Sequence, residues 1–251
     1  MIDEMIHKLS NCVTLSSRDK DVLRKMITKV VDLEKNTNVK REEEKPDFIH
    51  LLMNGWACRY KTLENGKEYI VGFLLPGDLS TLNASILTRM DHSIRTLTRV
   101  KLALIPQERI DHIHLYYPNI TRAFFWSTLL DESILREWLV SQGGRPAAVR
   151  LAHLFCEIMM RSRAAGLTDD YSFYMPLTQE ELGNATGLTK VHVNRCLRHL
   201  RMENLIEIHR HRVSILDWER LQTFGEFQTT YLHMPRIVAD LSLQEQVRKT
   251  G

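Results

Sequence analysis

The spacing of hydrophobic positions changes along the chain, and each change predicts a different kind of structure. Residues 3–36 have helical spacing: residues 14–17 are typical of a helix start, and apolar side chains then recur every three or four positions. From about residue 37 to residue 107, short β-like runs are separated by turn residues. Several strands at such short intervals predict an antiparallel β-roll or barrel.

Two of these turns have a specific chemistry. Asn54-Gly55 and Asn65-Gly66 each separate two β-like runs, and Asn-Gly pairs tolerate the positive φ angles of tight hairpin turns. We therefore expect a hairpin at each pair. The expected strands cover residues 48–52, 56–63, 67–74, 94–98 and 101–105.

A long segment without internal glycine or proline follows Pro118 and ends at Gln142, which predicts one helix of about seven turns. It is more apolar than a lone surface helix requires. Two interpretations are open: the helix packs against its own domain, or it forms the seam of a homodimer, which we favour. The residues assigned to the seam are Ile120, Phe124, Leu130, Ile134 and Trp138.

Further helical segments follow. Gly143-Gly144 predicts a helix break and a domain hinge, and residues 146–165 and 218–232 each have helical spacing. After Pro235, a second amphipathic stretch of the tail contains Ile237, Leu241, Leu243 and Val247. The expected domains are an N-terminal sensor, a dimerisation helix, a DNA-binding domain and a helical tail, covering residues 1–117, 118–143, 144–220 and 221–251.

The segment from residue 176 to residue 202 predicts two short helices joined by a tight turn. Thr178 and Glu181 have the spacing of a capping box, in which each side chain bonds to the other residue's backbone N–H. Gly187 suits the turn, and Thr189 can cap a second helix over residues 190–202. This pattern is typical of a helix-turn-helix.

The second helix has an apolar and a polar side. If Val193, Leu197 and Leu200 are buried, the opposite face and the first turn carry Lys190, Val191, His192, Asn194, Arg195 and Arg198. Arg195 can donate to the O6 and N7 atoms of guanine, and Val191 can pack on a thymine methyl group. The alternative is an ordinary solvated polar face.

A basic hairpin after this helix favours the DNA-binding interpretation. Residues 205–208 and 213–216 predict two strands around the sequence His-Arg-His-Arg at 209–212. Residues 189–212 contain six Lys or Arg against two acids, a net charge of +4, whereas the whole chain carries +3. This concentration lies where a phosphate backbone would pass, so we expect a winged helix-turn-helix.

The order of elements and three motifs resemble the bacterial CRP/FNR superfamily of transcription regulators, over residues 20–220. The motifs are LTQEELGNATGLTKVHVNR at 177–195, Asn204-Leu205-Ile206 before the wing, and the turn Leu75-Pro76-Gly77-Asp78. The resemblance implies an α+β fold with an N-terminal antiparallel, cupin-like β-roll, a long dimerisation helix and a C-terminal winged helix-turn-helix. It also implies a cytoplasmic homodimer on palindromic double-stranded DNA, with RNA polymerase as a further partner.

The resemblance assigns roles to individual residues. Arg195 matches the family's base-reading arginine, Thr189 a cap that contacts the DNA backbone, and Gln179 a phosphate contact. Val191 stands where many members have a glutamate that accepts from cytosine, so we expect a different DNA consensus. The full DNA-binding set is Gln179, Thr189, Lys190, Val191, His192, Asn194, Arg195, Arg198, Arg210 and Arg212.

An effector pocket in the roll is expected near Gly77, Asp78, Leu82, Met90 and Asp91. Leu82 stands where cyclic-AMP binders have a glutamate for the ribose, and Met90-Asp91 where they have Arg-Ser or Arg-Thr for the phosphate. Asp91 would repel a phosphate, so we do not expect control by cyclic AMP. The cysteine cluster of the iron–sulfur branch is missing, and Cys58 and His92 alone do not indicate haem. No cofactor is identified, and an unknown small-molecule effector stays open.

Composition narrows the remaining classes. The 251 residues are 43% hydrophobic and 26% charged, with no apolar run of membrane-spanning length and no basic, apolar leader at the N-terminus. The four cysteines are scattered, which favours reduced buried thiols over a metal site. We find no catalytic motif, so an enzyme is not expected. The alternative to a DNA-binding regulator is a small-molecule sensor that signals mainly through protein–protein contacts.

Overall fold

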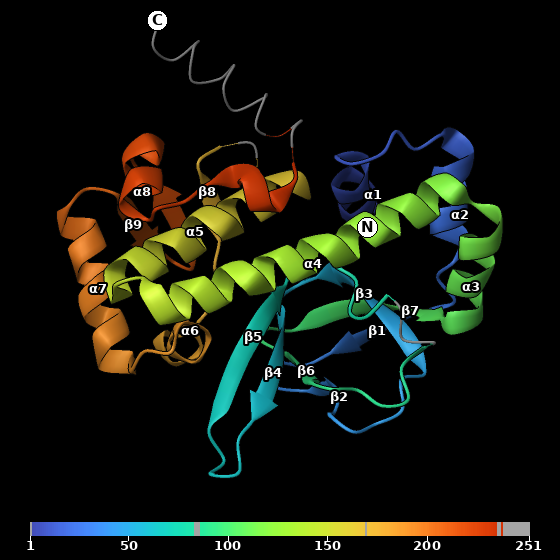
Figure 1. Ribbon diagram of the computed structural model, residues 1–251, viewed down its shortest axis with the longest axis horizontal. Coiled ribbons are helices and arrows are strands. Elements are labelled where there is room, and N and C mark those ends of the chain that lie inside the picture. The colour runs from blue at the N-terminus through green and yellow to red at the C-terminus, as the bar shows by residue number, and fades with distance from the viewer. Residues whose placement is uncertain (1, 83–85, 169, 235–236, 238–251) are drawn as a thin grey trace, which may run out of the picture.

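One long helix joins a β-roll to a helical half in the computed structural model, which describes residues 2–82, 86–168, 170–234 and 237. Figure 1 shows α4 (Pro118–Gly144) crossing the molecule, with the strands of the roll below it, α1–α3 at one end and α5–α8 at the other. The expected α+β fold is confirmed.

The roll consists of two antiparallel sheets flanked by three helices. The sheets have the strand orders β1-β7-β3 and β2-β6-β4-β5. Their strands are β1 (Lys29–Leu33), β2 (Asn38–Lys40), β3 (Phe48–Asn54), β4 (Ala57–Thr62), β5 (Glu68–Leu74), β6 (Ser93–Thr96) and β7 (Val100–Pro106). The helices are α1 (Asp3–Ser10), α2 (Ser17–Lys25) and α3 (Gln107–Tyr116).

The two Asn-Gly turns have different roles. Asn65-Gly66 closes the predicted β4–β5 hairpin, in which the Leu63 N–H donates to the Lys67 carbonyl at 2.9 Å and Gly66 has φ +78°. The hairpin predicted at Asn54-Gly55 is wrong, because β3 and β4 belong to different sheets and this turn carries the chain from one to the other. A Cβ at Gly55 would lie 2.4 Å from the Arg99 carbonyl oxygen, so the crossing requires glycine.

The prediction of helical structure through residue 36 is partly wrong. The helix start is confirmed, since Ser16 and Asp19 form a capping box at the beginning of α2. The helix ends at Lys25, however, and β1 follows as a strand paired with β7, with Val31 opposite Leu102. Two consecutive β-branched residues and the available edge of β7 outweigh the helical spacing of this segment.

The helical half contains the helix-turn-helix and a small sheet of order β8-β10-β9. Its elements are α5 (Ala147–Ala164), β8 (Ser172–Tyr174), α6 (Gln179–Thr186), α7 (Lys190–Met202), β9 (Ile206–His209), β10 (Arg212–Ile215), α8 (Trp218–Phe224) and the 3₁₀ helix η2 (Thr229–Leu232). The break expected at Gly143-Gly144 is wrong, because α4 continues through both glycines and ends before Arg145.

The predicted helix over residues 218–232 is divided in two. α8 ends at Phe224. A Cβ at the next residue, Gly225, would lie 2.9 Å from the His153 backbone nitrogen, so the chain turns against α5 at this point. The segment then forms η2, which packs on α4. Of the predicted second tail stretch, Ile237 packs against the main hydrophobic core, and Leu241, Leu243 and Val247 lie outside the described residues.

The roll and the helical half share one hydrophobic core. Trp56 and Phe73 of the roll and Trp138 of α4 form a chain of edge-on ring contacts, with centroid distances of 5.9 and 5.7 Å. The same buried cluster continues through α5 to α8. Helix α6 also packs on β5, and Lys35 Nζ, from the loop between β1 and β2, lies 3.9 Å from Glu181 Oε1 of α6. The two halves are therefore held together by apolar packing rather than by a linker alone.

A buried ionic network crosses the same boundary. Asp78, at the turn after β5, accepts from Lys8 of α1 at 2.6 Å, from Arg161 of α5 at 2.8 Å and from the Leu75 N–H at 2.9 Å. Burial alone would raise the pKa of Asp78, but the charges of Lys8 and Arg161 outweigh burial and hold that pKa well below its usual range. Asp78 is therefore an internal structural anion.

Replacing Asp78 by Asn removes the carboxylate that Lys8 and Arg161 both face in the core. We expect this change to lower the free energy of unfolding at neutral pH by about 3–5 kcal/mol, measured by urea titration with circular dichroism. Asp32→Asn, at an exposed position of β1, is the control and should change it by less than about 0.5 kcal/mol.

The pH dependence of this difference follows from the lowered pKa. The stabilisation by Asp78 is complete above its unfolded-state pKa of about 3.9 and is lost as the pH falls toward the lower folded-state pKa. The gap between wild type and Asp78→Asn should therefore narrow from about pH 5 to about pH 3. A gap of constant size over this range would contradict the ion pairs.

Candidate DNA-binding surface

The helix-turn-helix is formed by α6, the turn at Gly187 and α7. The predicted capping box is confirmed: the Glu181 N–H donates to Thr178 Oγ1 at 3.1 Å, and the Thr178 N–H donates to Glu181 Oε2 at 2.7 Å. Gly187 ends α6 with φ +68°, in the left-handed region that favours glycine. Thr189 then caps α7, since its Oγ1 accepts from the His192 N–H at 3.2 Å.

A second glycine, whose role the sequence pattern did not predict, brings the two helices close together. Gly183 lies inside α6, and a Cβ at this position would lie 2.5 Å from the Leu188 carbonyl oxygen. The Gly183 carbonyl in turn accepts from the Leu188 N–H at 3.0 Å. The turn therefore folds back onto α6, and only glycine leaves room for it.

Helix α7 has the orientation that its sequence predicts. Val193, Leu197 and Leu200 are buried, together with Cys196. Thr189 and the predicted reading residues are exposed: Lys190, Val191, His192, Asn194, Arg195 and Arg198. Val191 is 63% exposed, a large open fraction for an apolar side chain at the first turn of a helix. Gln179, the first residue of α6, is half-buried.

The wing is the hairpin of β9 and β10, as predicted, with a third strand, β8, on the other side of β10. Arg210 and His211 form its tip with φ values of +44° and +65°, so the two side chains stand at a tight exposed turn. Arg212 is exposed and pairs with Asp170 at 3.2 Å. Part of the charge of Arg212 is therefore already balanced, whereas Arg210 stands at the hairpin tip.

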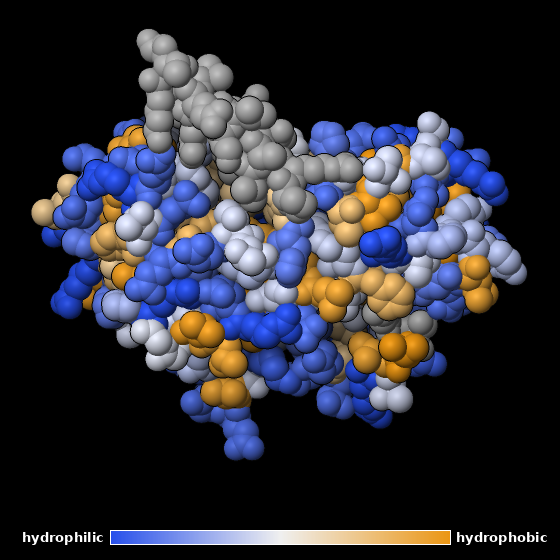
Figure 2. All heavy atoms as spheres, turned by 45° about the horizontal axis from the view of Figure 1, so that its top comes forward, coloured by the Kyte–Doolittle hydropathy of each residue, from blue (hydrophilic) through white to orange (hydrophobic). Residues whose placement is uncertain are grey.

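The five residues assigned to a dimer seam are all buried within the protomer. Ile120 and Phe124 pack with α1, α2 and the roll, and Leu130, Ile134 and Trp138 belong to the shared core. Their assignment to the seam is therefore wrong. The exposed apolar side chains of α4 are instead Phe125, Leu129, Leu135, Leu139 and Val140. Figure 2 shows apolar patches across the middle of the molecule, where α4 runs.

A cavity of about 440 Å³ lies between the roll and α4. Of the five predicted pocket residues, Leu82 and Asp91 line it. Gly77, Asp78 and Met90 do not: Gly77 packs against the Glu4 backbone, Asp78 forms the internal ion pairs, and Met90 is buried in a separate apolar cluster. The assignment of these three residues to the effector pocket is therefore wrong.

The basic residues of the cavity already have partners. Arg59 donates to the carbonyls of Leu79 and Ser80 and to Asp131 Oδ2 of α4, the last at 2.9 Å. Lys61 pairs with Glu42. Arg161 pairs with Asp78 and Glu157. The rest of the wall combines apolar and polar residues. The apolar ones are Val71, Phe73, Leu79, Leu82, Leu87, Ile134 and Leu135, and the polar ones are Ser80, Thr81, Asp91, His92, Ser127, Thr128 and Asp131.

Two family models match this chain, one on each half. Residues 30–116 match the cyclic nucleotide-binding domain, and residues 149–224 match the Crp-like helix-turn-helix domain. The matches coincide with the roll and with the winged helix-turn-helix, in the same order as in the CRP/FNR regulators. The chain belongs to the CRP/FNR superfamily. This regulator is thus a DNA-binding transcription factor, and its family consists of transcription regulators rather than enzymes.

Similar proteins agree with this assignment. The transcriptional activator protein FnrL of Cereibacter sphaeroides is 26% identical over 182 residues, which cover 71% of this chain and 73% of FnrL. The transcriptional activator protein Anr of Pseudomonas protegens is 24% identical, covering 82% and 84% of the two chains. The structure of FixK2 from Bradyrhizobium japonicum has the same fold, with a TM-score of 0.69, 18% identity and coverage of 78% and 96%.

The family relationship also indicates how such regulators bind DNA. Members bind DNA as dimers, which fits a palindromic site. Within the described part of the chain, no helix combines the length and apolarity needed to cross a membrane.

Replacing Gly183 by Ala tests the close approach of α6 and the turn. Alanine normally favours a helix over glycine by about 1 kcal/mol, but here its methyl group meets a backbone carbonyl. We expect Gly183→Ala to lower the free energy of unfolding by about 1–3 kcal/mol, measured by thermal and urea unfolding. In the matched control, Gly143→Ala in α4, no atom lies within 4 Å of the new Cβ, so stability should be unchanged or raised by up to about 1 kcal/mol. Equal effects of the two substitutions would contradict the steric explanation.

Proposed function

We propose that this regulator binds a palindromic DNA site as a homodimer, with α7 of each protomer in the major groove and each wing against the phosphate backbone. The observation that carries the proposal is the exposed, basic face of α7, followed in the chain by a wing whose tip is also exposed and basic and whose strand β9 contacts α7. The N-terminal half of a recognition helix reaches base edges, and Arg195 is an exposed residue in that half of α7.

Within each half-site we propose separate roles for the exposed residues. Arg195 donates to guanine O6 and N7, Val191 packs on a thymine methyl group, and Asn194 contacts a base or a phosphate. The other residues of the set hold the phosphate backbone: Gln179, Thr189, Lys190, His192, Arg198, Arg210 and Arg212. Val191 replaces a glutamate that selects cytosine in many members, so the consensus should differ from the common family half-site.

We propose that the dimer seam is the exposed apolar stripe of α4. Phe125, Leu129, Leu135, Leu139 and Val140 are each more than half exposed. At 100° per residue they fall within less than half of the helix circumference, which is the geometry of a helix-pairing face. Pairing of two copies along this stripe would cover apolar surface that a single protomer leaves in water.

The cavity chemistry favours an effector other than a cyclic nucleotide. A cyclic phosphate needs charge-assisted donors, whereas Arg59, Lys61 and Arg161 already pair with acids, and Asp91 adds a negative charge to the wall. The lining of apolar side chains with interspersed hydroxyl groups suits a small ligand that combines an apolar body with a few hydrogen-bonding groups. We further propose that the regulator contacts RNA polymerase at its promoters and acts in the cytoplasm, where that DNA lies.

Selection from random DNA duplexes tests the proposed function directly. The wild-type protein should enrich a palindrome whose half-sites lie about one helical turn apart. Arg195→Ala should cost about 1–3 kcal/mol of binding free energy and relax selection at one base pair per half-site. Arg210→Ala should weaken binding about equally on all sequences and lower the slope of log affinity against log salt by about 1 per protomer. Both are measured by fluorescence anisotropy.

Two outcomes would contradict these assignments. Failure of the wild-type protein to enrich any motif would count against sequence-specific binding. Equal changes in base preference for Arg195→Ala and Arg210→Ala would count against the division between base reading and phosphate contact.

The seam is tested by charge insertion on α4. Leu139 is 75% exposed, so Leu139→Asp should leave the fold intact while placing two like charges near each other in the dimer. We expect the dimer to dissociate at micromolar concentration, measured by analytical ultracentrifugation. Leu63→Asp, at an exposed position in the β4–β5 hairpin, is the matched control and should remain dimeric. A dimer that survives Leu139→Asp unchanged would place the seam elsewhere.

A further inference from the structure

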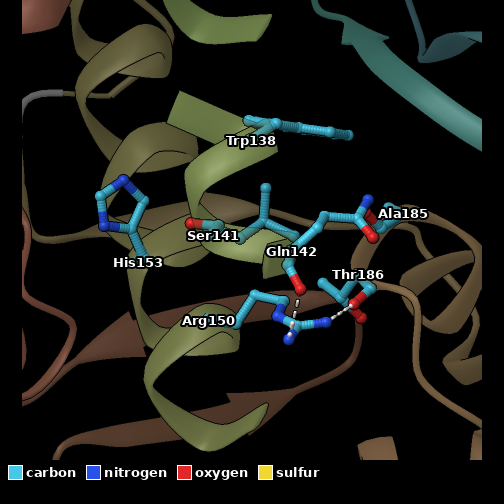
Figure 3. A pocket seen from close by; sticks show the side chains of 8 residues that line it. Trp138, Ser141, Gln142, Arg150, His153, Ala185 and Thr186 are labelled. Atoms are coloured by element: carbon cyan, nitrogen blue, oxygen red, sulfur yellow. Dashed lines mark hydrogen bonds between the residues drawn. The ribbon is translucent and has the colours of Figure 1, made fainter. Parts of the chain in front are cut away.

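One arginine of α5 joins the C-terminal ends of two other helices. Figure 3 shows Arg150 between the last turn of α4 and the end of α6. Its Nη2 atom donates to the carbonyls of Gln142 and Arg145 at 3.1 and 3.0 Å, and its Nη1 atom donates to the carbonyl of Thr186. The first two carbonyls belong to the end of α4, and the third is the last residue of α6.

The electrostatics of this junction favour a guanidinium. The C-terminal end of a helix carries free carbonyls and a partial negative charge, so two such ends facing each other repel. A planar cation with donors on both nitrogens satisfies both ends at once. Burial lowers the pKa of Arg150, but a guanidinium stays charged at neutral pH. In the described part of the chain, the hydrogen-bond acceptors of Arg150 are all backbone carbonyls.

Gln142 and Gly187 complete the contact. The Gln142 side chain, from α4, donates through Nε2 to the Ala185 carbonyl at 3.2 Å. A Cβ at Gly187 would lie 2.7 Å from Gln142 Oε1 and 3.4 Å from Arg150 Nη1. The positive φ of Gly187 favours glycine at this turn, and a Cβ there would also displace the ends of the Gln142 and Arg150 side chains. We call Gln142, Arg150 and the Ala185–Gly187 turn the junction.

The junction lies immediately before the reading helix α7 in the chain. Thr189, which caps α7, follows Gly187 by two residues, so the junction holds the turn from which α7 starts. On its other side it holds the end of α4, the helix that carries the proposed dimer seam. The packing of α7 on α5 and of α6 on β5 also orients the reading helix, and the junction adds the direct hydrogen bonds between the turn before α7 and the end of α4.

We propose that Arg150 is a positioning residue that fixes the angle between α7 and α4 and thereby the spacing of the two DNA half-sites. This proposal rests on the homodimeric DNA binding proposed above. In a dimer, both α7 helices are carried by the paired α4 helices, so their separation is set by how each helix-turn-helix sits on its own α4. Half-site spacing mirrors this separation.

A purely structural role for Arg150 is separable from this one. The helix-turn-helix has its own buried contacts, with Leu182 of α6 and Val193 and Leu197 of α7 in the core, and these persist without the guanidinium. Loss of Arg150 should therefore leave a folded DNA-reading unit that is less firmly oriented. The expected consequence is a loss of spacing discrimination, with base preference unchanged.

The test compares Arg150→Met with wild type on the palindrome that the wild-type protein selects. Affinities are measured on that site, on sites with one or two base pairs added or removed between the half-sites, and on a single half-site. Wild type should lose about tenfold or more in affinity when the spacing changes, because each base pair rotates one half-site around the DNA axis. Arg150→Met should bind the selected site more weakly, and its spacing penalty should shrink to about threefold or less.

Controls separate the possible outcomes. Arg109→Met, at an exposed position on α3, removes an equal charge and should keep the wild-type spacing profile. If Arg150→Met does not fold, Gln142→Ala, which removes one bond at an exposed position, should show a partial loss of spacing discrimination. Arg150→Lys keeps the charge but not the two-sided fork, so it should recover affinity more than spacing discrimination.

The proposal is overturned if Arg150→Met lowers affinity by the same factor at every spacing and on the half-site. Failure of the underlying DNA-binding proposal looks different, since the wild-type protein itself would then select no palindrome.

Discussion

The buried ion pair between Asp78 and Arg161 determines how the two halves of the molecule fit together. Asp78 belongs to the turn after β5, and Arg161 lies near the end of α5, 83 residues later. Arg161 also donates to the Phe73 carbonyl, so one guanidinium attaches α5 to the roll at two points. Apolar packing tolerates small shifts, whereas buried hydrogen-bonded charges are satisfied in only one geometry. The shared core supplies the attraction between the halves, and this pair selects their orientation.

Local patterns predicted the fold wherever a segment's own residues decide its structure. The capping box at Thr178, the turn at Gly187 and the long helix from Pro118 involve neighbours in sequence, and each is present. The errors arose where a distant segment decides. β1 is a strand because the edge of β7 is available, and the helix at Trp218 stops at Gly225 because α5 passes within contact distance. No window of local sequence contains these partners.

The candidate site shows the same division. The face of α7 could be predicted, because a helix with one apolar stripe leaves little choice of orientation. Helix α4 is apolar on more than one side, so its pattern could not tell which side meets its own protomer, and the wrong side was chosen for the seam. The sequence around Arg150 contained no pattern that predicts its role. Its partners are backbone carbonyls, one of them 36 residues away, and a carbonyl has no residue type to recognise.

The ring contacts from Trp56 through Phe73 to Trp138 constrain how such regulators diversify. A DNA-binding half with a core of its own could be replaced without disturbing the roll, because no packing would cross the boundary. Here an exchange would expose the indole of Trp138 and leave Asp78 facing an unrelated helix. A hybrid of this roll with an unrelated DNA-binding half would therefore lose packed apolar surface, whereas substitutions on the exposed face of α7 leave the shared core intact.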